Sequence, residues 1–204
     1  MRAAKRAGVV AATSLVALGI SPLASASHGP PHECQGHQVG SISLNQASNG
    51  DDYIGGDTGP NVIAAGEGRD QIWAGGGDDR LCGNEGDDEA LNGGYDFDQI
   101  NAGAGRDYSD GSYGHDVIDS GTHNDLSGGG MNDDDIQGHQ DNDVLGGEGG
   151  DDQVYGNEDN DDIYDGHGYD WLRGMAGIDH FYKCDGLNFN EGFEFVYPPN
   201  DANC

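Results

Sequence analysis

A unit of nine residues recurs along most of this 204-residue chain, and it limits the fold more than any other feature. In windows that start at Gly50, the third position is aspartate in fourteen of sixteen copies and asparagine in the other two, Asn61 and Asn188. The windows stay in register along the chain when one extra residue is allowed near Tyr95. The fifth position is large and apolar in twelve copies, and the first is nearly always Gly, Asn or Asp, which tolerate the positive φ of tight turns.

A period of nine with one apolar residue per copy indicates a coil of short strands. Each strand points its apolar residue inward, and the glycine-rich remainder turns the chain through about half a circle, so two nonapeptides complete one coil. A single buried side chain is too little for one copy to fold alone, and stability must come from stacking. The sequence therefore predicts an all-β protein, a right-handed parallel β-roll (solenoid) of about sixteen nonapeptide repeats.

Stacking would gather the third-position residues along two edges. The first edge receives Asp52, Asp70, Asp88, Asp107, Asp125, Asp143, Asp161 and Asp179. The second receives Asn61, Asp79, Asp98, Asp116, Asp134, Asp152, Asp170 and Asn188. Strands in a sheet are ~4.8 Å apart, so these carboxylates repel one another unless a cation lies between them.

Calcium is the cation that suits these edges best. Ca²⁺ accepts ~6–8 oxygen ligands in flexible geometry, whereas Mg²⁺ demands a stricter octahedron and holds its water more tightly. Each gap offers carboxylates and the backbone carbonyls of a glycine-rich turn. We therefore predict that the fourteen aspartates of the two edges ligate Ca²⁺, with seven gaps on each edge and at most fourteen sites.

The composition also calls for a cation. The chain has 38 Asp and Glu against 8 Lys and Arg, a formal charge of -30, with only 34% hydrophobic residues, values typical of a disordered polyelectrolyte. Such a chain is an improbable partner for nucleic acid or an anionic membrane surface. We expect calcium ions as its partners and folding that depends on them.

The first 26 residues have the pattern of a secretory signal peptide. Arg2, Lys5 and Arg6 precede an apolar run over 8–20, and small residues at 24–26 supply a cleavage site. No other stretch approaches the ~20 apolar residues of a membrane helix, so we expect a secreted, extracellular protein without membrane insertion. The predicted organisation is a signal peptide (1–26), an N-terminal lead-in and cap (27–49), the calcium-binding roll (50–192) and a C-terminal cap (193–204).

Four cysteines in an exported chain favour disulfides, and three pairings are open. We predict that Cys34 pairs with Cys82 and Cys184 with Cys204, because the other pairings would span most of the roll. Histidines around Cys34 in SHGPPHECQGH are an alternative zinc site, but their spacing matches no structural zinc pattern.

The nonapeptide resembles the G-G-x-G-x-D-x-U-x repeat of the RTX (hemolysin-type calcium-binding) family, as in GGEGGDDQV over 146–154. The resemblance covers roughly residues 50–192. It implies a parallel β-roll in which the third-position aspartates ligate calcium together with turn carbonyls. The chain departs from the family pattern in its Sec-type signal, in lacking a companion toxin or enzyme domain, and in several degenerate copies.

Three functions agree with these features. The residues directly support a freestanding secreted calcium-binding protein; the alternatives are a calcium-dependent adhesion protein of a cell wall or matrix and a polysaccharide-active enzyme on a parallel β-coil. Metal ligation already explains the regular acids, and neither H-E-x-x-H nor G-x-S-x-G occurs, so we expect no enzyme and no catalytic residues.

The middle of the predicted core is weak. The inward positions Ala90, Ser109 and Ser127 follow one another on one sheet and lack a large apolar side chain. Tyr108 or Leu126 would turn inward if the register slipped by one residue. We expect this region to loosen first when calcium is removed.

Overall fold

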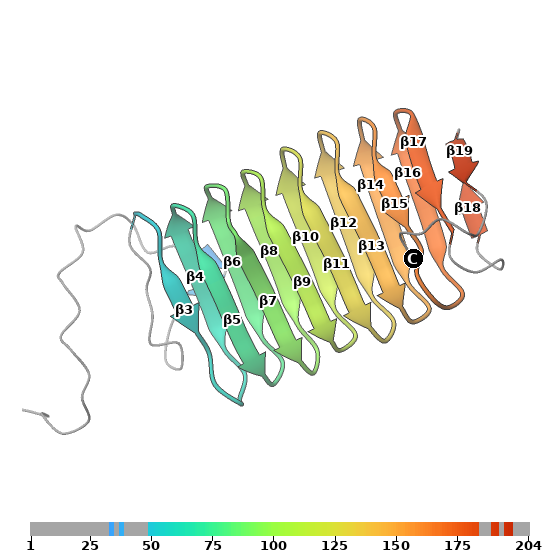
Figure 1. The fold of residues 1–204 in the computed structure, drawn as a ribbon. Helices are drawn as coiled ribbons and strands as arrows, with labels where there is room; N and C mark the ends of the chain where they lie inside the picture. The colour runs from blue at the N-terminus through green and yellow to red at the C-terminus, as the bar shows by residue number, and fades with distance from the viewer. Residues whose placement is uncertain (1–32, 35–36, 39–48, 184–188, 192–193, 198–204) are drawn as a thin grey trace, which may run out of the picture.

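The computed structural model of the chain describes residues 33–34, 37–38, 49–183, 189–191 and 194–197. Every regular element in these ranges is a β-strand, and none of them holds a helix that is long and apolar enough to cross a membrane (Figure 1). The predicted signal peptide, the predicted pair of Cys184 with Cys204, and Asn188 lie outside the described residues.

Nineteen strands follow one another along the described chain. Their bounds are β1 Glu33–Cys34, β2 His37–Gln38, β3 Tyr53–Gly55, β4 Val62–Glu67, β5 Gln71–Gly76, β6 Arg80–Glu85, β7 Ala90–Tyr95, β8 Gln99–Ala104, β9 Tyr108–Tyr113, β10 Val117–Thr122, β11 Leu126–Met131, β12 Asp135–Gln140, β13 Val144–Gly149, β14 Gln153–Glu158, β15 Asp162–Tyr164, β16 Trp171–Ala176, β17 Asp179–Tyr182, β18 Phe189–Glu191 and β19 Glu194–Tyr197.

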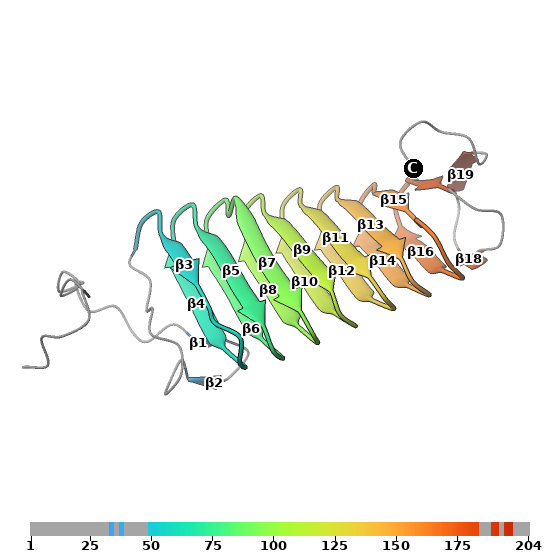
Figure 2. The ribbon, with the colours of Figure 1, turned by 60° about the horizontal axis from the view of Figure 1, so that its bottom comes forward.

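Two parallel sheets make up the roll. The even-numbered strands from β4 to β18 form an eight-stranded sheet, and the odd-numbered strands from β3 to β19 form a nine-stranded sheet. The chain alternates between the sheets, so each coil adds one strand to each layer (Figures 1 and 2). Paired residues such as Ile118 and Ile136 are 18 positions apart, which is two nonapeptides. The predicted all-β parallel roll is confirmed; the total of sixteen repeats stays a prediction.

The inward fifth-position side chains form one continuous core between the sheets. They are at most 2% exposed: Ile54, Ile63, Ile72, Leu81, Ile100, Ile118, Ile136, Leu145, Val154, Ile163, Leu172 and Phe181. The other inward position, two residues later, is small in most strands: alanine at Ala65, Ala74 and Ala102, serine at Ser120 and glycine in most others. Most strands therefore contribute one large and one small residue to the interior.

One inward position was predicted wrongly. The core residue of β7 is Leu91, fully buried opposite Ile72, and not Ala90, which lies opposite Gln71. The extra residue of the repeat array is therefore at Glu89–Ala90, not near Tyr95. The additional residue forms a bulge at the start of the strand, which lets the larger side chain fill the core.

The two serine positions are inward as expected. Ser109 and Ser127 are buried, while Tyr108 and Leu126 stay 43% and 45% exposed on the outer face, so the register does not slip. Ser127 makes a 2.7 Å hydrogen bond across the interior with Ser120 of the other sheet.

Both ends of the roll carry additional strands. At the N-terminal end, β1 and β2 pair antiparallel, and a disulfide joins Cys34 to Cys82 of β6, as predicted, with 5.5 Å between the Cα atoms. This bond removes the Cys34 thiolate from the alternative zinc site. At the other end, β19 pairs with β17, so the nine-stranded sheet continues into the segment predicted as the C-terminal cap.

Candidate calcium-binding edges

The third-position aspartates form two ladders along the edges of the roll. The Oδ1 atom of each accepts a hydrogen bond from the backbone N–H of the corresponding residue one coil earlier; Asp134 accepts from Asp116 at 2.7 Å and Asp152 from Asp134 at 2.9 Å. The same contact links Asp52 through to Asp179 on one edge. On the other edge it runs from Asn61 through to Asp170. The structure thus brings the predicted residues together in the predicted two rows.

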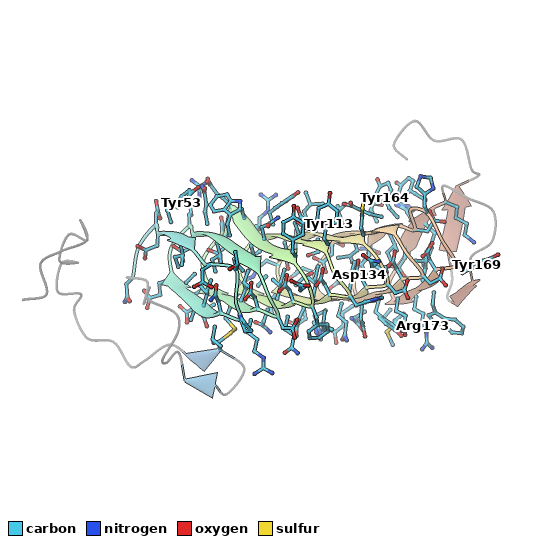
Figure 3. The ribbon with its side chains drawn as sticks, turned by 90° about the horizontal axis from the view of Figure 1, so that it is seen from below. Tyr53, Tyr113, Asp134, Tyr164, Tyr169 and Arg173 are labelled. Atoms are coloured by element: carbon cyan, nitrogen blue, oxygen red, sulfur yellow. A yellow bond between two sulfur atoms is a disulfide. The ribbon has the colours of Figure 1, made fainter. Side chains whose placement is uncertain are left out.

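The second carboxylate oxygen of these residues is buried and lacks a hydrogen-bond partner in the described structure. This holds for Oδ2 of Asp70, Asp79, Asp88, Asp98, Asp107, Asp116, Asp125, Asp134, Asp143, Asp152 and Asp161. Figure 3 shows Asp134 between the two layers. Asp52, at the first coil, is only half-buried. A buried carboxylate oxygen without a partner is costly, so these oxygens require a proton or a cation.

Inward glycines make room for these carboxylates. A Cβ added at Gly129 would lie 2.4 Å from Oδ2 of Asp134, and one at Gly147 would lie 2.4 Å from Oδ2 of Asp152. A glycine stands five residues before eight of the ladder aspartates, from Gly83 before Asp88 to Gly174 before Asp179, and is part of the site there. Ala65, Ala74, Ala102 and Ser120 hold the same position before Asp70, Asp79, Asp107 and Asp125. Sequence reasoning assigned the glycines to turns alone and missed this role, although their fixed distance from the aspartate was a usable signal.

Burial raises the pKa of the ladder aspartates strongly. Desolvation is the largest cause, the backbone hydrogen bond opposes it, and neighbouring carboxylates add to it in most positions. The pKa rises to about 8 at Asp98, Asp125 and Asp152. It rises to about 7 at Asp88, Asp134, Asp143 and Asp161, and to about 6 at Asp79, Asp107 and Asp116.

The turns supply a second set of oxygens. A Cβ added at Gly86 would lie 1.7 Å from the carbonyl oxygen of Gly68, and one at Gly168 would lie 1.7 Å from that of Gly150. Turn carbonyls therefore point along the stack toward the next turn. Both Gly86 and Gly168 have positive φ, and Asn132 adopts φ 80° at the equivalent position, as expected for the first residue of the repeat.

A second row of side chains also links successive turns by hydrogen bonds. The residue before several ladder aspartates accepts a hydrogen bond from the backbone N–H of the following coil: Asp133 from Asp151 and Asp151 from Tyr169, both at 2.9 Å. Sequence reasoning missed this row. The Asp-Asp doublets of the repeat could have indicated this row. Metal ligation explains only the second aspartate of each doublet and leaves the first without a role.

The donor set fits a hard divalent cation. Among the described residues, no three His, Cys, Asp or Glu side chains come close enough to hold a metal by themselves. A cation at the edges would need backbone carbonyls beside the carboxylates, and Ca²⁺ accepts this mixture.

Comparison with known families agrees with this donor set. The family model of the RTX calcium-binding nonapeptide repeat (4 copies) matches residues 55–90, 87–118 and 128–163. A search of curated proteins finds no match. The matched segments lie within the stacked coils and include ladder aspartates of both edges.

Proposed function

Because the chain belongs to the RTX calcium-binding nonapeptide repeat family, we propose that it is a secreted protein whose roll folds when several Ca²⁺ ions bind between its stacked turns. The ligands would be the fourteen predicted aspartates, from Asp52 to Asp179, together with turn carbonyls. When bound, Ca²⁺ neutralises carboxylates that the fold brings close together.

One observation carries this proposal: the row of buried Oδ2 atoms that no donor satisfies. A purely structural aspartate would use both oxygens for hydrogen bonds or turn one toward water. These residues satisfy Oδ1 through the neighbouring coil, and most of them direct Oδ2 at an inward glycine. The pattern is that of a carboxylate held in position for a cation.

Coupling between calcium and folding follows from the charge. With 38 acidic residues against 8 basic ones, the chain repels itself until cations bind. A ligand that binds only the folded state stabilises it by mass action, so calcium outside the cell would drive folding after export. The signal peptide predicted over 1–26 supports this location.

Calorimetry of the chain with Ca²⁺ and with Mg²⁺ tests the proposal. We expect binding of several Ca²⁺ ions per chain and much weaker binding of Mg²⁺. Asp143→Asn removes a ladder charge and should lower the number of bound Ca²⁺ ions. The control is Asp119→Asn, on the outer face of the eight-stranded sheet, which should leave the number unchanged. Equal effects of the two variants, or no calcium binding, would refute the assignment.

Calcium-dependent adhesion is a second candidate function, favoured by aromatic residues on the outer face of the nine-stranded sheet. Three stacked pairs lie there: Tyr53 with Trp73, Tyr95 with Tyr113, and Tyr164 with Tyr182. Such rings can stack on sugars. Retention of the protein on insoluble cell-wall polysaccharide in calcium, lost on chelation, would support adhesion. Retention that is the same with and without calcium would contradict it. A catalytic activity is not part of either proposal.

A further inference from the structure

The outer face of the nine-stranded sheet has a hollow between β9 and β15. One outward column of side chains runs across these strands in register, as Asp110, Gly128, Gly146 and Tyr164. The two successive glycines leave the sheet uncovered, and the hollow there has a volume of 480 Å³. That size falls within the ~300–1,000 Å³ of ligand pockets and exceeds what a metal ion needs.

One side of the hollow is apolar. Tyr108, Leu126 and Val144 form the neighbouring outward column, again in register, and all three line the hollow. Leu126 is 45% exposed although its inward neighbour Ser127 is buried. An apolar strip of this kind, in a chain so poor in apolar residues, marks a surface that is suited to an aliphatic ligand group.

Two carboxylates lie on the other side. Glu148 reaches across from β13, and a Cβ added at Gly128 would lie 2.8 Å from its Oε1. Asp110 is next to Gly128 in the column and accepts hydrogen bonds from Asn92 and Ser112. Within the described part of the chain, no side chain donates a hydrogen bond to the Glu148 carboxylate. Desolvation and the neighbouring Asp110 charge raise the pKa of Glu148.

The positive charge that would balance this pair is missing from the wall of the hollow. None of the Lys and Arg residues in the described ranges, Arg69, Arg80, Arg106, Arg173 and Lys183, lines it. Figure 3 shows Arg173 on the opposite face of the roll from Tyr164. His167, which also lines the hollow, is exposed and is the one basic group there. A cationic ligand would therefore complement the two carboxylates.

We propose that this hollow binds a lysine or arginine side chain of a partner protein. The aliphatic stem of that side chain lies along Leu126 and Val144, and its cationic head lies between Asp110 and Glu148. Tyr164, at the end of the column, provides an aromatic face of the kind that attracts cations. Long basic side chains combine an apolar stem with a charged head, which matches the two sides of the hollow. Neither acid is a predicted calcium ligand, although the charges of Asp110 and Glu148 contribute to the raised pKa of the ladder residues Asp116 and Asp134.

The test uses the full, calcium-loaded chain labelled with ¹⁵N and three capped tripeptides, Gly-Lys-Gly, Gly-norleucine-Gly and Gly-diaminopropionate-Gly. Norleucine keeps the stem and lacks the charge, whereas diaminopropionate keeps the charge and lacks most of the stem. We expect the lysine peptide alone to shift the amide resonances of Gly128 and Gly146, and the shift to weaken at high salt. Gly55 and Gly76, outside the hollow, should not shift.

Two pairs of variants separate the site from general attraction to an acidic protein. Gly146→Val places a side chain in the hollow, where the atoms nearest to an added Cβ are 3.9 Å and 4.0 Å away, and it should abolish the shifts. Its control, Gly55→Val, lies in the same outward column with nothing within 4 Å and should leave them unchanged. Glu148→Gln should raise Kd about tenfold, as expected for loss of a charge-assisted hydrogen bond, whereas Glu158→Gln on the other sheet should not.

Retained calcium binding by calorimetry confirms that each variant folds. Shifts scattered over the turns, equal shifts with all three peptides, or binding that Gly146→Val leaves intact would each overturn the proposal. A neutral oligosaccharide that shifted Gly128 and Gly146 while the lysine peptide did not would also overturn it and would identify a glycan site instead.

Discussion

Each ladder aspartate divides its two carboxylate oxygens between separate roles. Oδ1 accepts a hydrogen bond from the backbone N–H of the previous coil, and at eight of the ladder positions Oδ2 occupies the space left by an inward glycine. The first contact holds adjacent coils in register, and the second leaves a buried anionic oxygen. The ladder aspartate and the inward glycine therefore act as one unit, although they are five residues apart in the sequence.

Gly129→Ala tests this unit. The added Cβ would lie 2.4 Å from Oδ2 of Asp134, so the carboxylate must move. We expect a loss of about 1–3 kcal/mol in the free energy of unfolding, typical of overpacking, together with weaker calcium binding. Gly55→Ala, with nothing within 4 Å, should change the stability by less than ~0.5 kcal/mol. Urea unfolding in saturating calcium measures both, and equal stabilities would contradict the account.

The two core serines should respond to alanine in opposite directions. The Ser109 hydroxyl is buried without a hydrogen-bond partner in the described structure, whereas the Ser127 hydroxyl bonds to Ser120. Ser109→Ala removes an unsatisfied group and should stabilise the fold by up to about 1 kcal/mol, while Ser127→Ala leaves Ser120 unsatisfied and should destabilise it by about 1 kcal/mol. Urea denaturation midpoints of the two variants decide this; midpoints that move in the same direction would be inconsistent with it.

At the scale of the strand and coil, the repeat determined most of what the sequence could predict. The apolar fifth-position residues, which start at Ile54, identified the core, the two sheets and the two acid rows. A chain with one apolar side chain in every nine residues can bury these side chains in few folds. The bulge at Glu89–Ala90 could not be located, because an extra residue anywhere between Asp88 and Asp98 preserves both acid positions, and only packing favours Leu91. The hollow at Gly128 and Gly146 was also missed, since it depends on which outward residues become neighbours.

The coils that contain Ser109 and Ser127 should open first when calcium is withdrawn. They bury a hydroxyl where neighbouring coils bury Leu91 and Leu145, so they lose apolar burial worth about 1.5–3 kcal/mol per side chain. Because coupling in a solenoid is between neighbours, opening should begin locally. Hydrogen exchange at limiting calcium should show the amides of β9 and β11 exchanging before those of β13. Maximal protection of β9 and β11 would be evidence against this order.

For the whole molecule, protons and calcium should compete for the same oxygens. In the calcium-free chain, the folded-state pKa of about 6 to 8 at most ladder aspartates lies above the ~3.9 of an unfolded aspartate. Protonation therefore stabilises the calcium-free roll fully below about pH 4, and this stabilisation is lost as the pH rises through 6 to 8.

We accordingly expect the chelated protein to gain β-sheet circular dichroism on acidification from pH 8 to pH 4, at concentrations where it stays in solution. Calcium binding should show the opposite dependence and strengthen as the pH rises through the same range, because the metal needs ionised carboxylates. A chelated protein whose sheet signal is lost on acidification would contradict the assigned direction.

The central claim is that the apolar column is too thin to hold the coils together while the acid ladders are ionised, and that Ca²⁺ supplies the missing stabilisation. Far-ultraviolet circular dichroism at pH 8, recorded in millimolar calcium and again after excess chelator, tests it most directly. The account predicts a strong β-sheet spectrum with calcium, a largely disordered spectrum after chelation, and full recovery when calcium is restored. An ordered sheet spectrum that persists unchanged in chelator would contradict it.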